Sequence, residues 1–229
     1  MDGGQDSCET WSDGLAPLLH EGVSDRKRRL FAVACLRRRL DLLDDPRSRQ
    51  ALIQAQRYAE GLITEQERLL VDHDAFQAFQ EMRDARLGES LLAWSWQQEQ
   101  LRRAASLLVT PGLYYAEDVA DHARRAVGGG DEGWLREQQE LQVQYALLAE
   151  ILGPRPLPHI DPLWLTQDDS AVLQLARSIH LRGEQELYPL LADALEFAGC
   201  NSEAMLTHCR VGGVHLPGCW VVDLLLGLD

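Results

Sequence analysis

Helix start and stop signals recur along almost the whole sequence, whereas strand signals are nearly absent. Ser24 is a good N-cap before a helical pattern of apolar residues, and Pro46 opens the next pattern at the position where proline is favoured. Thr64 and Glu67 form a capping box, and the helix that they start can run until Gly88. Few stretches alternate apolar and polar residues. The pattern therefore predicts an all-α fold, an irregular multi-helix bundle of about 9–11 helices.

A proline-rich run divides the chain into two helical parts. Residues 153–158 read Gly-Pro-Arg-Pro-Leu-Pro, which cannot form a helix and must be extended. We therefore predict a helical body, residues 1–152, and a smaller C-terminal helical module that contains cysteine and histidine, residues 159–229. The two parts can pack together as one domain, since 229 residues are one large domain or two small ones.

The composition is that of a globular protein kept in a reducing compartment. Apolar residues make up 45% and charged residues 25% of the chain, and no window approaches the roughly 18 consecutive apolar residues of a membrane span. The first 21 residues are acidic and lack the basic and apolar regions of a secretion signal. The five cysteines are too few for a disulfide scaffold in a chain of this length. We expect a cytoplasmic protein with reduced thiols and no contact with a membrane.

The net charge of −14 is unevenly distributed. Residues 24–60 carry ten basic and five acidic side chains, although the chain as a whole is acidic. An arginine-rich helix over 26–49 could neutralise phosphates of a nucleic acid, but the overall negative charge opposes such binding. The interleaved aspartates favour a solvated or salt-bridged face instead. The residues that would contact nucleic acid are Arg26, Lys27, Arg29, Arg37 and Arg38.

The tail contains the densest group of possible metal ligands. Zinc takes four Cys or His ligands in structural sites, so Cys200, Cys209, His215 and Cys219 are a candidate set, with His208 as an alternative fourth ligand. His208 and Cys209 are adjacent, and a helix would point them about 100° apart, so they are not expected to bind one ion together. The spacing matches no standard zinc finger. The competing interpretation makes the cysteines buried apolar residues and the histidines partners of helix-end carbonyls. Apart from zinc in the tail, the leading interpretation of the chain requires no cofactor.

Several segments of the tail and of the first helices resemble one protein family. The segments are Asp161–Thr166 (DPLWLT), Leu190–Cys200 (LLADALEFAGC), His208–Arg210 (HCR), His215–Gly227 (HLPGCWVVDLLLG) and Ser24–Cys35 (SDRKRRLFAVAC). With these motifs the chain resembles a multi-copy family of uncharacterised planctomycete proteins. The resemblance covers both ends of the chain and skips roughly residues 62–145. It implies an accessory or interaction protein, and it implies no particular activity.

Catalytic signatures are scarce. The sequence has no phosphate loop, no dinucleotide-binding glycine pattern, no paired-His zinc protease motif and no nucleophile elbow. His73-Asp74 on a helix is similar to the metal-binding dipeptide of the HD phosphohydrolases, with His20 and Asp118 or Asp121 as further ligands. That match is a dipeptide with poor spacing, and a solvated polar face explains it as well.

The leading hypothesis is therefore a non-enzymatic protein that binds another protein, such as an adaptor, a regulatory subunit or an inhibitor of the immunity type. Its acidic body suits a protein partner, including a basic one. Trp94 and Trp96 lie on nearly opposite sides of a helical segment, so one of them can be exposed as part of a partner surface. A nucleic-acid-associated protein and an HD-like metal-dependent hydrolase remain the alternatives.

Overall fold

The computed structural model describes residues 14–20, 22–87, 95–110, 115–211, 213 and 215–228. Within them it contains helices and no strand, so the predicted all-α class is confirmed. Twelve α-helices lie in these ranges, one more than the upper end of the prediction. The additional helix is α1, which has only five residues and no start signal in the sequence. No helix in the described part of the chain is both long enough and apolar enough to cross a membrane.

Seven of these helices precede the extended segment that follows Leu152. Their bounds are α1 (Ala16–His20), α2 (Asp25–Arg37), α3 (Pro46–Ala59), α4 (Glu65–Leu87), α5 (Trp96–Leu108), α6 (Tyr115–Arg125) and α7 (Gly133–Leu152). Five follow it, namely α8 (Pro162–Thr166), α9 (Ala171–Arg182), α10 (Tyr188–Phe197), α11 (Glu203–Arg210) and α12 (Trp220–Leu226). We call the described residues up to Leu152 the body and the described residues after it the tail.

The predicted helix starts are present as hydrogen bonds. The side chains of Ser24 and Asp45 each accept a backbone N–H from the first turn of the helix that follows. At the start of α4, the Glu67 carboxylate accepts the N–H of Thr64 at 2.7 Å, and Thr64 Oγ1 accepts the N–H of Glu67 at 3.3 Å. These bonds occupy donors that no helical carbonyl can reach, which fixes where each helix begins.

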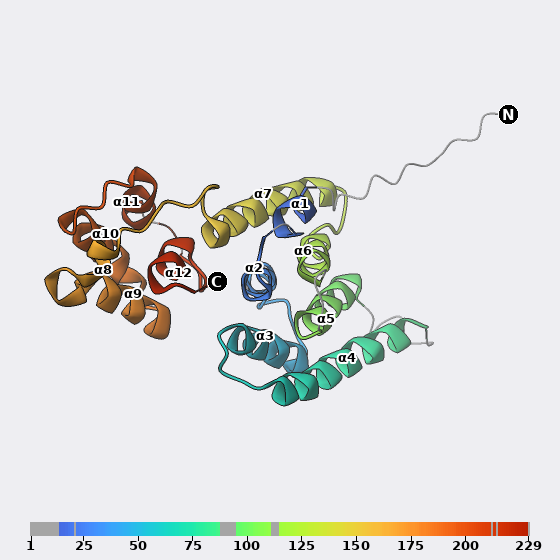
Figure 1. The fold of residues 1–229 in the computed structure, drawn as a ribbon. Coiled ribbons are helices and arrows are strands. Elements are labelled where there is room, and N and C mark those ends of the chain that lie inside the picture. Colours follow the sequence, from blue (N-terminus) through green and yellow to red (C-terminus); the bar gives the residue numbers. More distant parts are fainter. Residues whose placement is uncertain are drawn as a thin grey trace.

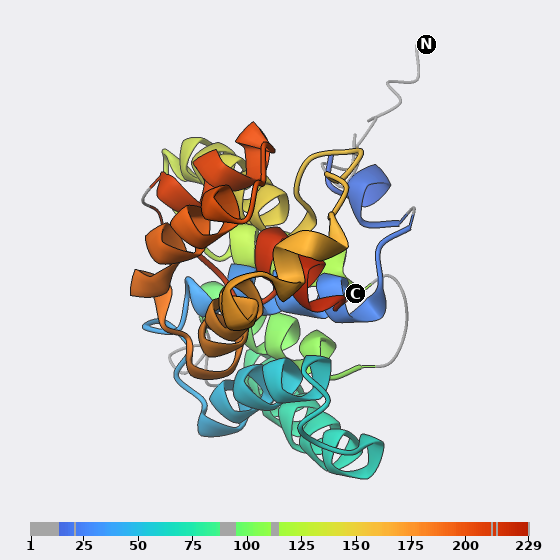
Figure 2. The same ribbon diagram turned by 60° about the vertical axis from the view of Figure 1, so that its left-hand side comes forward.

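Helix α2 is the centre of the body. It packs against α3, α5, α6 and α7, while α4 lies along α3 and α5. Figure 1 shows this arrangement, with α12 of the tail lying between α2 and the other tail helices. Figure 2 shows from another side that the tail covers one flank of the body helices. The second helix of the chain therefore lies close to its last helix.

The buried apolar residues form two separate clusters. One contains residues between 15 and 151 and is centred on α2, where Phe31, Cys35 and Leu36 are fully buried. The other contains residues between 164 and 225, including Leu191 and Val221. Each part of the chain therefore has an apolar core of its own, and Leu216 of the tail packs against the core of the body.

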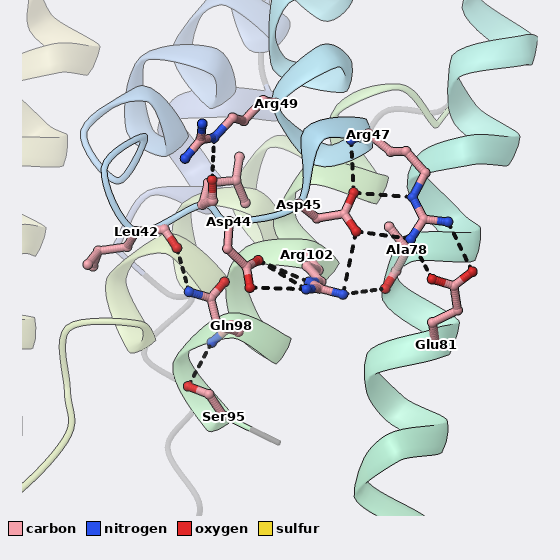
Figure 3. Close-up of polar contacts among 11 residues, drawn as sticks. Leu42, Asp44, Asp45, Arg47, Arg49, Ala78, Glu81, Ser95, Gln98 and Arg102 are labelled. Carbon is pink, nitrogen blue, oxygen red and sulfur yellow. Dashed lines mark hydrogen bonds and ion pairs between the residues drawn. The ribbon is translucent and has the colours of Figure 1, made fainter. Parts of the chain in front are cut away.

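A network of ion pairs joins α3, α4 and α5 (Figure 3). Asp45 accepts hydrogen bonds from the backbone and side chain of Arg47 at 2.8 and 2.9 Å, and Arg47 also binds Glu81 at 3.0 Å. Arg102 of α5 donates to Asp44 at 3.1 Å and lies 3.6 Å from Asp45. Partial burial acts to raise the pKa of Asp45, but the hydrogen bonds from Arg47 and the charge of Arg102 outweigh it and lower this pKa.

Candidate functional site at the junction of body and tail

A buried carboxylate holds α12 of the tail against α2 of the body. Asp223 is only 1% exposed, and Oδ2 of its carboxylate lies 2.7 Å from Arg26 Nη1 and 2.6 Å from Lys27 Nζ. Arg26 also binds Glu60 of the body at 3.1 Å. Two cations of α2 therefore meet one buried acid of the tail, which compensates the cost of burying it.

The segment 215–219, which leads into α12, passes very close to α2. Lys27 Nζ donates to the carbonyls of Ile151 and Gly218 at 2.9 and 3.1 Å. Gly218 has φ +86°, and a Cβ atom at this position would lie 2.6 Å from Leu30 Cδ1. Only glycine combines this backbone conformation with so close an approach. We call residues 215–219 the junction loop.

Four side chains that can bind metal converge beside the junction loop. Glu150 extends from α7 of the body, His208 from α11, and His215 and Cys219 from the two ends of the loop. Glu150 Oε1 lies 3.0 Å from His215 Nδ1, Glu150 Oε2 lies 3.3 Å from His208 Nε2, and His208 Nε2 lies 3.2 Å from Cys219 Sγ. One potential ligand atom from each residue lies within 4.8 Å of all the others. We call these four residues the junction cluster.

Aromatic side chains surround the junction cluster on two sides. The Tyr188 ring stacks on His215 with centroids 3.5 Å apart, and the Tyr188 hydroxyl is hydrogen-bonded to Cys219. Trp220 Nε1 donates to His208 Nδ1 at 3.2 Å. These contacts hold both imidazoles and the thiol in the orientations seen here, before any metal is bound.

The charges in the cluster depend on one another. Burial acts to raise the pKa of Glu150, but hydrogen bonds from His208 and His215 lower it to about 2, so the carboxylate is ionised. Burial, and next the charge of Glu150, raise the pKa of the Cys219 thiol well above its usual value. A thiol held protonated in this way is a poor nucleophile, since the thiolate is the reactive form. The raised pKa of Cys219 therefore speaks against this thiol as a nucleophile in the metal-free protein.

The structure brings together only part of the zinc set expected from the sequence. Of the four residues named there, His215 and Cys219 are in the junction cluster, whereas Cys200 and Cys209 are not and are buried in the tail core. His208, the alternative ligand, is in the cluster, and its neighbour Cys209 points elsewhere, in agreement with the helical spacing. Glu150 was missed, because nothing in the sequence links a glutamate of a body helix to the tail.

Most of the arginine-rich helix is engaged within the protein. Arg26 and Lys27 bind Asp223, Arg29 is 2% exposed and bonded to Asp25, and Arg38 binds Glu140 at 2.8 Å. These residues form a salt-bridged face between elements and do not form a continuous basic surface. Arg37 differs from them, because its side chain donates to the neutral amide of Gln56 and no described carboxylate lies at ion-pair distance from it.

The other predicted site residues are not brought together. His73 and Asp74 are exposed on α4, and Asp118 is exposed on α6. Among the side chains that the structure describes, His73 belongs to no group of three or more potential metal ligands. Asp121 is paired with Arg124 and Arg125, and the side chain of His20 is outside the description. Trp96 is partly buried at the start of α5, and Trp94 lies outside the described residues.

An apolar cleft opens on the body side of the junction loop. It has a volume of about 260 Å³. Apolar side chains of α2, α7 and the loop form its floor and walls, and polar side chains of α2 and α3 form its rim. Its lining residues are Leu30, Val33, Ala34, Leu147, Leu216 and Pro217, with Arg37, Arg38 and Gln56 at the rim.

Comparison with known proteins adds no relative to this description. No protein-family model, no curated protein and no solved structure matches the chain. The resemblance to the planctomycete family therefore stays a prediction.

Proposed function

We propose that this protein is a non-enzymatic accessory protein that binds a segment of a partner protein in the apolar cleft along α2. The supporting observation is an apolar floor with Arg37 at its rim, a guanidinium that has no carboxylate at ion-pair distance among the described residues. The cleft is smaller than the roughly 300–1,000 Å³ of typical small-molecule sites. Its size suits one large apolar side chain, the kind of anchor on which protein interfaces depend.

The charges beside the cleft indicate the chemistry of the partner. Arg38 and Arg39 both bind the single carboxylate of Glu140, so the local balance with Arg37 is positive. This local excess contrasts with the net charge of −14. The net charge alone favours a basic partner, whereas the cleft favours a segment that has acidic residues beside its apolar anchor.

Peptide selection on the full-length chain tests this proposal. A random peptide library displayed on phage should yield sequences that place Asp or Glu next to a large apolar residue. Calorimetric titration of such a peptide should show at least roughly tenfold weaker binding to Arg37→Glu, since a charge-assisted hydrogen bond is lost and a repulsion is added. The matched control is Arg83→Glu, which makes the same charge change at a guanidinium that is 47% exposed on α4. Selection of basic peptides, or equal binding to both variants, would contradict the proposal.

A further inference from the structure

We infer that the junction cluster is a zinc site that fixes the tail to the body. Two imidazoles, one thiol and one carboxylate are donor groups that Zn²⁺ takes in proteins, and four of them make a closed tetrahedral site. The ligands come from α7, α11 and both ends of the junction loop, so one ion would join three segments of the chain. This inference does not depend on the proposed partner of the apolar cleft.

The distances fit such an ion. Zn–N bonds of about 2.0–2.1 Å and Zn–S bonds of about 2.3 Å place tetrahedral ligand atoms roughly 3.3–3.6 Å apart. The potential ligand atoms lie 3.0 Å apart for Glu150 and His215, 3.3 Å for Glu150 and His208, and 3.2 Å for His208 and Cys219, and no pair exceeds 4.8 Å. The widest pair therefore needs to close by only about 1 Å, well within the reach of side-chain rotation.

The charges fit as well. Zinc removes the proton of a thiol that it binds, so Cys219 becomes a thiolate and its proton goes to solvent, while Glu150 contributes a carboxylate. Two negative ligands and two neutral imidazoles then leave the zinc site with no net charge, which suits its partly buried position. The hydroxyl of Tyr188, already hydrogen-bonded to Cys219, can donate to the thiolate.

A second cleft, between body and tail, reaches the junction loop from solvent. It has a volume of about 420 Å³, and His215, Cys219 and Tyr188 contribute to its wall. The ion can therefore reach its ligands from solvent without separation of body and tail.

Zinc binding should be visible in the fluorescence of Trp220. The indole only donates, so its hydrogen bond to His208 Nδ1 places the imidazole proton on Nε2, the atom that faces Glu150 and Cys219. When zinc occupies Nε2, a neutral imidazole carries its proton on Nδ1, where it opposes the indole N–H. The Trp220 side chain must then lose this hydrogen bond and its surroundings must change.

The experiment uses the full-length chain, freed of metal by a chelator under reducing conditions and titrated with zinc chloride. We expect one zinc per chain, a change in tryptophan fluorescence and a higher temperature of unfolding. In Trp220→Phe the fluorescence change should disappear while calorimetry still shows binding. His215→Ala and Cys219→Ala should bind zinc more than about 100-fold more weakly, because losing a ligand costs more than losing an outer partner of a ligand. The matched control Cys200→Ala removes a thiol that is buried outside the cluster and should bind normally.

Cobalt substitution keeps the test decisive if a variant folds poorly. In the unaltered chain, Co²⁺ should give the absorption of a tetrahedral site together with a thiolate-to-cobalt charge-transfer band, and this band should be absent from Cys219→Ala. Circular dichroism checks that each variant is folded. Absence of zinc binding by the folded chain, or binding that persists in both His215→Ala and Cys219→Ala, would overturn the inference.

Discussion

Removing the Asp223 carboxylate should destabilise the protein by about 3 kcal/mol. In Asp223→Ala, Lys27 and Arg26, which are only 11% and 14% exposed, lose the acid that compensates their burial. Breaking a buried ion pair by removing one partner costs about 3–5 kcal/mol. We expect the lower end of this range, because Arg26 keeps Glu60 and Lys27 keeps two carbonyl acceptors.

Urea denaturation followed by circular dichroism and by tryptophan fluorescence measures this loss, provided that both signals change together. The double variant Lys27→Met/Asp223→Leu should recover much of the stability, since apolar residues of similar size can replace a buried pair. Glu196→Ala is the control, because its ion pair with Arg210 is exposed on the tail and should matter little. A loss below about 1 kcal/mol in Asp223→Ala would refute the reasoning that this pair holds α12 on α2.

Three further predictions concern stability and thiol reactivity. Because the pKa of Asp45 is lowered in the folded protein, its carboxylate contributes stability above the unfolded pKa of about 3.9, and this stability is lost as the pH falls through the folded pKa. The free energy of unfolding of Asp45→Asn, measured in urea, should therefore depend less on pH than that of the unaltered chain between about pH 5 and 2. Gly218→Ala should lower the free energy of unfolding by more than Gly183→Ala, because both glycines have positive φ but only Gly218 has a neighbour, Leu30, within 4 Å of the added Cβ. The four described cysteines are buried and have raised pKa values. In Cys8→Ser, which leaves only these four thiols, a disulfide reagent should modify them far more slowly in the native protein than in urea. Equal rates of modification would contradict the burial of the thiols.

The fold could be predicted from the sequence to the extent that it depends on local signals. Ser24, Asp45 and the capping box at Thr64 mark helix starts because their hydrogen bonds are made within one turn of the chain. The extended segment after Leu152 was foreseen because proline excludes a helix. Helix α1 was missed, since it carries no such local signal.

The candidate site could be predicted only in part, because it depends on long-range contacts. His215 and Cys219 were named from their spacing, which is a local property. Glu150 was missed because it reaches the cluster only through the packing of α7 against α12. Charge patterns were ambiguous for the same reason, since the partner of Arg26 lies in α12 and no local rule connects them.

The pairing of α2 with α12 also sets an order of events during synthesis. Arg26 and Asp223 are separated by 197 positions, so the helices of the body leave the ribosome before the acid that binds α2 has been made. At about 5–20 residues per second, the segment from Leu152 to Asp223 takes on the order of several seconds to appear. During this interval the nascent body presents Lys27 and Leu30 to solvent without the loop that covers them in the finished chain.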